Sequence, residues 1–257
     1  MRRPWIKSPP PNRIVAEFEF PYLAHAPMEP LNATIRFDGD KAEAWVPSQF
    51  QTMDQMAIGE VLGLKPEQVT FHTEFAGGGF GRRAVIDSHV PREAAIIARR
   101  LRGTPVKLIW TREDDVRGGY YRPAHAHRVE IGIGTDGMPS AWRHVIVGQS
   151  LLAGTPFAGM IKNGVDETAV EGTADTSYVI PNFLVSVHHP VVNVPVLWWR
   201  SVGHTHNAFV METLIDELAT RARMDPINYR RKLLKPDAKK LRSVLDLLEE
   251  KLSVWRH

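Results

Sequence analysis

The chain has 257 residues, of which 43% are hydrophobic and 24% are charged. This composition is typical of a globular protein with enough chain for one large domain or two small ones. The absence of cysteine excludes disulfides, cysteine-ligated zinc, iron–sulfur clusters held by this chain and a cysteine nucleophile. No apolar run approaches the roughly 20 residues that cross a bilayer. The proline-rich start lacks the apolar core of a signal peptide, so the cytoplasm is expected by default and the periplasm stays open for an intact protein.

The net charge is +3, and the excess of basic residues is local. Nine Lys or Arg and two Asp lie between Arg221 and Arg242. Such a basic segment is more often a solvated helical face than a surface that contacts nucleic acid or an acidic partner. No aromatic platform is interleaved with these charges, so nucleic-acid binding is not expected.

In the first half of the chain, apolar spacing changes from a period of two to the helical period and back. Residues 1–13 are predicted to form an extended arm, and residues 14–257 the domain. Alternation predicts a strand at 13–20, and strands at 34–37 and 43–46 flank the turn Asp38-Gly39. A helix follows from Met53 to a cap at Gly63, and then a strand at 69–75.

The second half contains one more hairpin and a helical end. A helix from Pro91 to Gly103 precedes a strand at 106–110, and strands at 127–133 and 141–148 flank Asp136-Gly137. Residues 149–181 are irregular, residues 183–189 form the last strand, and the remainder is helical with a start at Asp225-Pro226. The predicted fold class is α+β, a mixed sheet with hairpins and helices.

A glycine loop follows the strand predicted at 69–75. It reads Phe75-Ala76-Gly77-Gly78-Gly79-Phe80-Gly81-Arg82-Arg83. Glycines let backbone N–H groups approach an anion or a bulky cofactor, and two adjacent arginines suit a phosphate. Neither common nucleotide fingerprint fits, because Arg82 stands where G-x-G-x-x-G needs glycine and no Gly-Lys-Ser/Thr follows. A structural turn is the alternative interpretation of this loop.

A second stretch of interest runs from Trp198 to Asn207 at the start of a predicted helix. A helix N-terminus favours negative charge, and Arg200 can hold a carboxylate or phosphate through two hydrogen bonds. The alternative is a strand-to-helix turn capped by Asn207.

Histidines occur in two further patterns that could form chemical sites. The pairs His188-His189 and His204/His206 lack His-Glu-x-x-His spacing, so ordinary hydrogen-bonded histidines are favoured and no side-chain metal site is expected. His25 and Glu29 lie in a proline-bounded loop that is either an acid–base site or, by default, a turn.

Five segments of the sequence are more informative in combination than separately, because of the order in which they occur. They are Ala24–Pro30, Pro47-Ser48-Gln49, Gly77–Arg82, Trp110–Asp115, and Arg200–Gly203 followed by Asn207 and Glu212. This order closely resembles the molybdopterin-binding subunit of the xanthine dehydrogenase/aldehyde oxidase family, and especially its isoquinoline 1-oxidoreductase β-subunit type. The resemblance extends from about residue 14 to the C-terminus.

The resemblance implies a molybdenum–molybdopterin cofactor, commonly the cytosine dinucleotide in bacterial members, and oxidation of aldehydes or N-heteroaromatic compounds. It also implies electron transfer to a separate iron–sulfur subunit. Gln49 matches the glutamine near the metal oxo group. The residues that match the two cofactor loops are Gly78, Gly79, Phe80, Gly81 and Arg82 in the first and Arg200, Ser201, Val202 and Gly203 in the second.

Three departures from the family pattern refine this expectation. Val202 and Ala84 replace the aromatic and the glutamate of purine-oxidising relatives, which favours an aldehyde or a plain heterocycle. No segment matches the glutamate that acts as the catalytic base near the C-terminus of intact subunits. We therefore expect the first cofactor-binding domain only, inactive by itself and partnered by the missing second domain or chain. The alternative is a non-catalytic module that docks a partner subunit.

Overall fold

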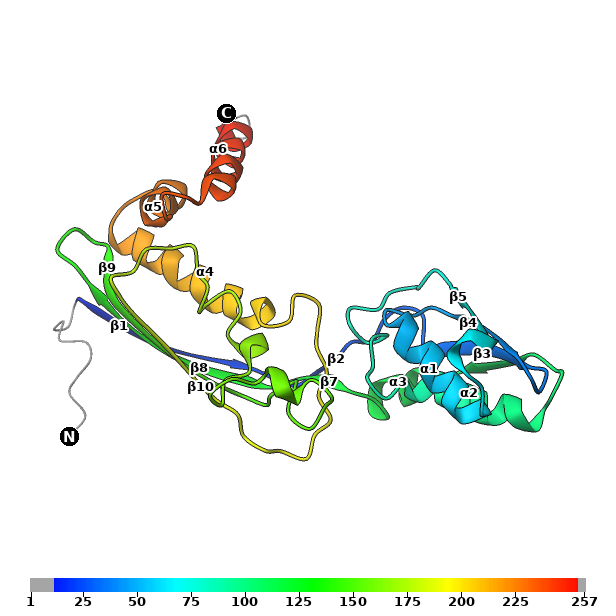
Figure 1. Cartoon of the computed structure of the whole chain (residues 1–257). Coiled ribbons are helices and arrows are strands. Elements are labelled where there is room, and N and C mark those ends of the chain that lie inside the picture. Colours follow the sequence, from blue (N-terminus) through cyan, green and yellow to red (C-terminus); the bar gives the residue numbers. More distant parts are fainter. Residues whose placement is uncertain (1–11, 254–257) are drawn as a thin grey trace. The chain divides into compact units, whose positions relative to one another are not determined.

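The structure is a computed structural model that describes residues 12–253 (Figure 1). The chain packs as two units. Unit 1 contains residues up to Pro21, Ala124–Val191 and the residues from Ser201 onward, and unit 2 contains Tyr22–Pro123 and Val192–Arg200. The expected single domain from residue 14 thus divides into two cores, and most of the predicted arm lies outside the described residues.

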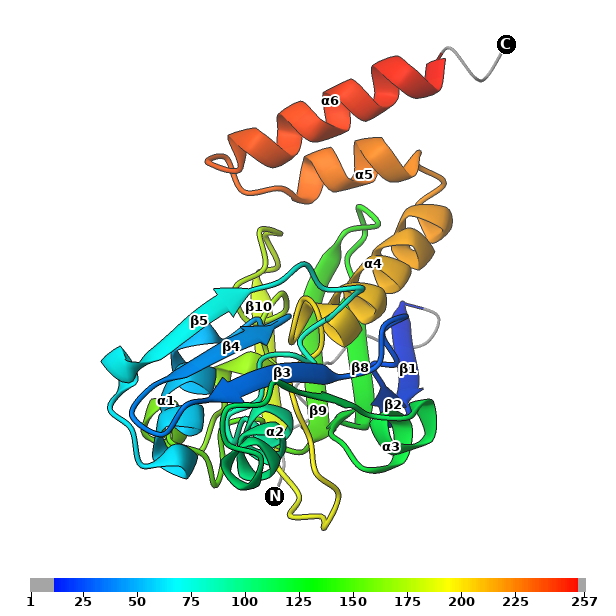
Figure 2. The same ribbon diagram turned by 90° about the vertical axis from the view of Figure 1, so that its right-hand side faces the viewer.

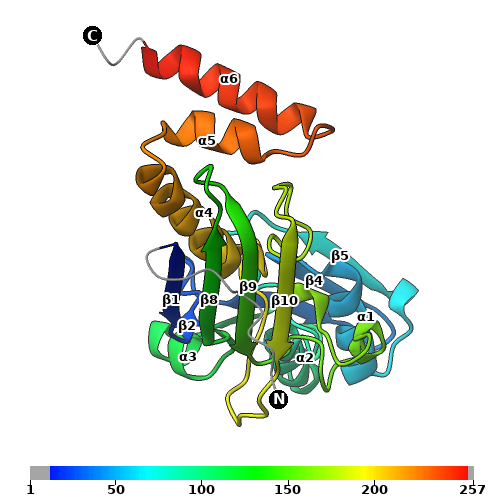
Figure 3. The same ribbon diagram turned by 90° about the vertical axis from the view of Figure 1, so that its left-hand side faces the viewer.

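Unit 1 is built on a four-stranded sheet in the order β1-β8-β9-β10, seen face-on in Figure 3. The strands are β1 (Arg13–Phe20), β8 (His125–Ile133), β9 (Pro139–Gly148) and β10 (Asn182–His188). The first three are antiparallel neighbours, and β10 runs parallel to β9. The predicted turn at Asp136-Gly137 joins β8 to β9, where Gly137 has a φ of 79°.

One face of this sheet is covered by α4 (His204–Arg221). The helix presents a stripe of buried side chains spaced three and four residues apart, Met211, Leu214, Ile215 and Leu218, against Val129, Ile131 and Trp142 of the strands. The chain ends in α5 (Pro226–Leu233) and α6 (Lys239–Ser253). As predicted, Asp225 caps α5, since its carboxylate accepts hydrogen bonds from the N–H groups of Ile227 and Asn228.

Unit 2 has a second four-stranded sheet, in the order β5-β4-β3-β6; β3, β4 and β5 are labelled in Figure 2. These strands are β3 (Asn32–Phe37), β4 (Ala42–Val46), β5 (Val69–Thr73) and β6 (Val106–Ile109). The helices α1 (Gln51–Leu62) and α2 (His89–Arg100) pack on it around Ile35, Ala44, Ile58 and Ala95. The predicted Asp38-Gly39 turn and the left-handed cap at Gly63 are both present.

Short elements complete the two units. In unit 2 these are η1 (Pro66–Gln68), α3 (Arg112–Arg117) and the strand pair β2 (Leu23–Ala24) and β7 (Tyr121–Arg122). In unit 1 the irregular stretch 149–181 contains η2 (Ala158–Met160) and η3 (Glu167–Ala169). No helix between residues 12 and 253 has both the length and the apolar character of a membrane span.

Candidate cofactor-binding site

The glycine loop of unit 2 is built around the side chain of Gln49. The Oε1 atom of Gln49 accepts hydrogen bonds from the N–H groups of Gly81 (3.2 Å) and Arg83 (3.3 Å). The backbone N–H of Gln49 donates to the carbonyl of Arg83 (3.0 Å). Because Oε1 is held by two donors, the amide NH₂ of this exposed side chain is the group left to bind a ligand acceptor.

The glycines are required by close approach and by backbone conformation. A Cβ at Gly79 would lie 2.4 Å from Oε1 of Gln49, and a Cβ at Gly81 would lie 2.4 Å from the carbonyl oxygen of Trp198. Gly78 and Gly81 have φ angles of 102° and 100°, and Phe80 between them has a φ of 57°. A non-glycine residue in this region is strained, which is common at ligand sites.

The loop carries three consecutive N–H groups that are available to a ligand. Among the residues that the structure describes, none accepts a hydrogen bond from the N–H of Gly78, Gly79 or Phe80. Successive backbone N–H groups in such a bend form a binding surface for anionic or strongly polar atoms. The loop is only partly open: Gly77 is exposed and Phe80 is 40% exposed, whereas Gly78 is half-buried and Gly79 is buried. These features fit a bulky ligand that presents acceptor atoms.

Glu29 and Arg83 hold the loop from behind. The carboxylate of Glu29 accepts from the N–H of Gly77 (2.9 Å) and pairs with Arg83 (2.8 Å), and Arg83 also donates to the carbonyl of Gly78 (2.8 Å). Partial burial acts to raise the pKa of Glu29, but the hydrogen bond from Gly77 and the charge of Arg83 outweigh it, and the pKa lies below its ordinary value. The carboxylate of Glu29 is thus ionised and anchored, and the loop that contains His25 and Glu29 serves as a structural turn, which is the default interpretation of that loop.

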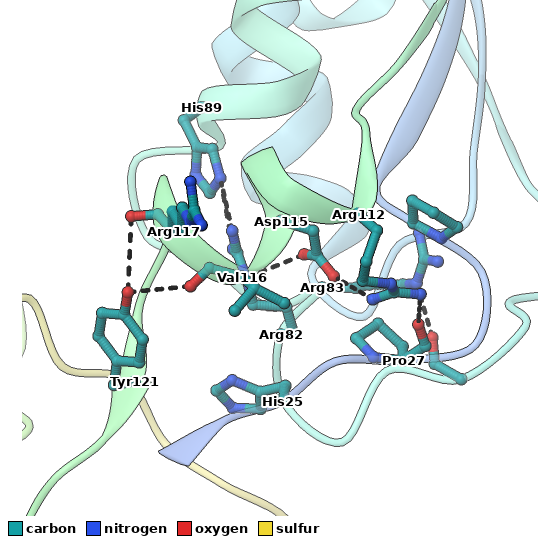
Figure 4. Close-up of polar contacts among 12 residues, drawn as sticks. His25, Pro27, Arg82, Arg83, His89, Arg112, Asp115, Val116, Arg117 and Tyr121 are labelled. Atoms are coloured by element: carbon teal, nitrogen blue, oxygen red, sulfur yellow. Dashed lines mark hydrogen bonds and ion pairs between the residues drawn. The ribbon is translucent and has the colours of Figure 1, made fainter. Parts of the chain in front are cut away.

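The Arg82 side chain points into unit 2, as Figure 4 shows. It is 1% exposed, and its guanidinium lies 3.7 Å from the carboxylate of Asp115, which is equally buried. It also lies over the rings of Trp110 and Tyr120, while His89 accepts from it at 3.2 Å. The guanidinium is therefore out of reach of a solvent-exposed phosphate, contrary to the expectation for this arginine. The sequence does not predict this inward direction, because side chains of an irregular loop follow no repeating pattern of buried and exposed positions.

The segment before the second predicted loop lies against the glycine loop. The N–H of Arg200 donates to the carbonyl of Phe80 (2.9 Å), and Nε2 of His25 contacts the carbonyl of Trp198 (2.9 Å). His25 is buried and stacks on Trp199, with ring centroids 4.7 Å apart. Burial lowers the pKa of His25, so the neutral imidazole that donates to Trp198 is favoured. The structure therefore brings Arg200 to the loop that the sequence singled out.

The rest of the second loop belongs to unit 1. Ser201 and Val202 have φ angles of 73° and 45°, so the backbone is strained here too. A Cβ at Gly203 would lie 2.3 Å from the carbonyl oxygen of Thr168, which explains the glycine. The expected cap role of Asn207 is wrong, because Gly203 is the N-cap residue. Asn207 is buried and donates instead to the carbonyls of Ala169 (3.1 Å) and Glu171 (2.8 Å).

The basic segment near the C-terminus is partly neutralised within unit 1. Arg230 pairs with Glu212 and Asp216 at 2.8 and 2.6 Å, and Arg231 pairs with Asp246 and Glu249 at 2.7 Å each. Arg230 and Arg231 are therefore paired within the chain and largely covered, while Lys232, Lys235, Lys239 and Lys240 of the same segment are exposed to solvent, as the sequence predicts for a helical face. In the described part of the chain, no group of three His, Asp or Glu residues is arranged to hold a metal ion.

Comparison with known proteins identifies similar chains. The molybdopterin cofactor-binding domain family matches residues 11–234. The isoquinoline 1-oxidoreductase subunit beta of Brevundimonas diminuta is 34% identical over 218 residues, which is 83% of this chain and 27% of that protein. The aldehyde oxidoreductase molybdenum-binding subunit of Escherichia coli is 27% identical over 85% of this chain and 28% of its own length. The chain therefore spans little more than a quarter of these relatives.

Solved structures show the same fold. Quinoline 2-oxidoreductase from Pseudomonas putida 86 aligns with a TM-score of 0.73 and 19% identity over 90% of this chain and 29% of its own chain. The aldehyde oxidoreductase of Desulfovibrio gigas aligns with a TM-score of 0.67 and 22% identity over 88% of this chain. The mixed α+β fold expected from the sequence is confirmed.

Proposed function

Because the chain belongs to the molybdopterin cofactor-binding domain family, we propose that it forms part of a molybdenum hydroxylase and holds one side of its cofactor. The observation that carries this proposal is the glycine loop, where three backbone N–H groups that find no acceptor among residues 12–253 lie beside the anchored amide of Gln49. When bound, the cofactor supplies the two-electron oxidation of a substrate carbon. The proposed substrates are aldehydes or N-heteroaromatic compounds, in line with the names of the relatives.

The residues of this chain bind and orient the cofactor. The N–H groups of Gly78, Gly79 and Phe80 would donate to acceptor atoms of the cofactor, and the NH₂ group of Gln49 would donate to an acceptor near the metal centre. Gly81 keeps the loop close to Trp198. Ser201, Val202 and Gly203, which match the second cofactor loop of the family, are also proposed to contact the cofactor. Arg200 contributes positive charge, which suits a pterin phosphate or an extended form such as the cytosine dinucleotide.

The proposal requires partners. An iron–sulfur subunit accepts the electrons, since a chain without cysteine holds no such cluster itself. A second cofactor-binding part, as a domain or a chain, supplies the catalytic base. We expect the purified chain alone to be inactive.

The test is the molybdenum content of the chain co-purified with the remaining parts of the enzyme. We expect wild-type protein to retain molybdenum and Gly79→Ala to lose most of it, because the new Cβ displaces the Gln49 amide. Gly159→Ala is the matched control, since nothing lies within 4 Å of its Cβ. Equal molybdenum content in the two variants contradicts the proposal.

A second candidate function is a non-catalytic module that docks a partner subunit. It is favoured by exposed apolar side chains on one helix, α6, where Leu241, Val244 and Leu248 are 45%, 62% and 44% exposed. The same co-purification separates the two functions, because a docking module assembles with its partner without retaining molybdenum.

A further inference from the structure

Unit 1 contains a cluster of four buried histidines that the cofactor site does not use. His125 and His127 lie on β8, His144 lies on β9, and His206 lies in the first turn of α4. Their side chains are only 6%, 3%, 0% and 2% exposed, respectively. Fully buried histidine clusters are uncommon, because the imidazole is polar and titrates near neutral pH.

The cluster is connected by direct contacts between rings. The Nδ1 atom of His206 lies 3.0 Å from Nε2 of His127, and Nδ1 of His127 lies 2.8 Å from Nε2 of His144. His125 stacks on His206 with centroids 3.7 Å apart and planes 20° apart. The rings therefore tie the first turn of α4 to two strands of the sheet. They do not constitute a metal site, since no group of three ligands suited to a metal occurs among residues 12–253.

The hydrogen bonds between the rings of His206, His127 and His144 limit where their protons can lie. Each ring–ring hydrogen bond needs one N–H and one lone pair, so a neutral His127 donates one bond and accepts the other. The Nδ1 atom of His144 is buried and has no hydrogen-bond partner in the described part of the chain. A bare lone pair there costs less than a buried N–H. The favoured arrangement has His144 donating to His127, and His127 donating to His206.

An additional proton on His144 or His127 breaks this arrangement. A protonated His144 carries an N–H at Nδ1, where no acceptor lies. A protonated His127 donates from both nitrogens, so His144 must accept at Nε2 and again carry its N–H at Nδ1. Either protonation thus places both a positive charge and an unpaired donor inside the core.

Among the described residues, the strand partners of His127 and His144 carry no compensating negative charge. An acidic group does contact the first turn of α4: the carboxylate of Glu171 lies 3.8 Å from the ring of His204 and accepts from the N–H of Gly203 (3.2 Å). The residues paired with or neighbouring these rings on β1, β8, β9 and β10 are apolar, namely Phe18, Phe20, Val129, Ile146 and Val185. The charged β8 residues Arg128 and Glu130 alternate with the histidines and pair with each other. His189 bonds the carbonyl of Gly148, opposite His125. Burial lowers the pKa of His144 to about 4, and burial with the neighbouring His144 and His125 lowers the pKa of His127 to about 2.

We propose that the four-histidine cluster is an acid-sensitive latch for the first turn of α4. Neutral rings hold this turn to β8 and β9, and proton uptake below the ordinary histidine range releases it together with the Ser201–Gly203 loop, which immediately precedes the helix. The contact between the released Ser201–Gly203 loop and a cofactor is part of the proposed function. The latch itself is independent of that function.

The test is hydrogen exchange of the full chain between pH 7 and pH 4.5, corrected for the intrinsic effect of pH on exchange. A ring that is neutral when packed and protonated when released makes opening tenfold more frequent per pH unit below its ordinary pKa. His127 and His144, whose packed rings have lowered pKa values, together contribute a rise of about a hundredfold per unit for residues 201–210. The strands β3 and β4 of unit 2, which contain no histidine, should lack this acid-driven opening.

Variants and a second measurement keep the test decisive. His144→Gln keeps a donor toward His127 but cannot titrate, and should reduce the rise to about tenfold per unit. His188→Asn, which removes an exposed histidine of unit 1, should leave it at a hundredfold. An unchanged rise in His144→Gln overturns the latch. If that variant does not fold, nitrogen NMR of the native chain decides, because a His127 or His144 ring that titrates near pH 6.5 in the folded protein also overturns it.

Discussion

Replacing Gly81 by alanine tests why the glycine loop has its sequence. Two costs add at this position. A φ of 100° is left-handed, which costs an alanine about 1–2 kcal/mol. The new Cβ would also lie 2.4 Å from a backbone oxygen, that of Trp198, and such overpacking typically costs a further ~1–3 kcal/mol. We therefore expect Gly81→Ala to lower the free energy of unfolding by about 2–5 kcal/mol.

The matched control is Gly63→Ala at the end of α1. Gly63 has a φ of 70°, but nothing lies within 4 Å of its Cβ, so only the conformational cost of about 1–2 kcal/mol applies. Urea unfolding followed by tryptophan fluorescence measures both variants, since Trp45, Trp110, Trp198 and Trp199 all belong to unit 2. The reasoning is refuted if Gly81→Ala is no less stable than Gly63→Ala.

Three further predictions concern the supports of the two loops. Asp115→Asn leaves the Arg82 cation buried without its main counter-charge, so urea unfolding should show a loss of about 3–5 kcal/mol, and a loss below about 1 kcal/mol would falsify the buried pair. The folded pKa of Glu29 lies below its ordinary value of 4.5, so its carboxylate stabilises the fold above pH 4.5 and loses this contribution as the pH falls. The variant Glu29→Gln should therefore show a smaller decrease in the free energy of unfolding between neutral and acidic pH than the wild type. An equal decrease in the two proteins contradicts this role. Asn207→Ala removes two hydrogen bonds to carbonyls, and hydrogen exchange at residues 169–172 should accelerate by at least tenfold, whereas unchanged exchange rules out the anchoring role.

Local signals in the sequence predicted the elements of this fold well. Asp38-Gly39 and Asp136-Gly137 gave both hairpins, and Asp225-Pro226 gave the start of α5. These features depend on residues within a few positions of one another. The parallel pairings of β4 with β5 and β9 with β10 join segments separated by a helix or a long loop. No local pattern encodes them, and the division into two cores depends on the same pairings.

The candidate site shows a similar limit. The glycine loop stands out by its own composition, whereas Gln49 is identified only through the resemblance, and the hydrogen bonds of Gln49 to the loop give a physical reason for its position. The inward direction of Arg82 depends on Asp115 and Trp110, which are distant in the sequence. The histidine cluster was missed for the same reason. Alternation along β8 places His125 and His127 on one face, but His144 and His206 join them only through the tertiary fold.

The location of the cofactor in a crystal structure of the assembled enzyme tests the central claim most directly. The account predicts acceptor atoms of the pterin or metal centre within hydrogen-bond distance of the N–H groups of Gly78, Gly79 and Phe80, with the NH₂ group of Gln49 directed at the same ligand. A glycine loop covered by protein side chains, with the cofactor bound elsewhere, would contradict the account.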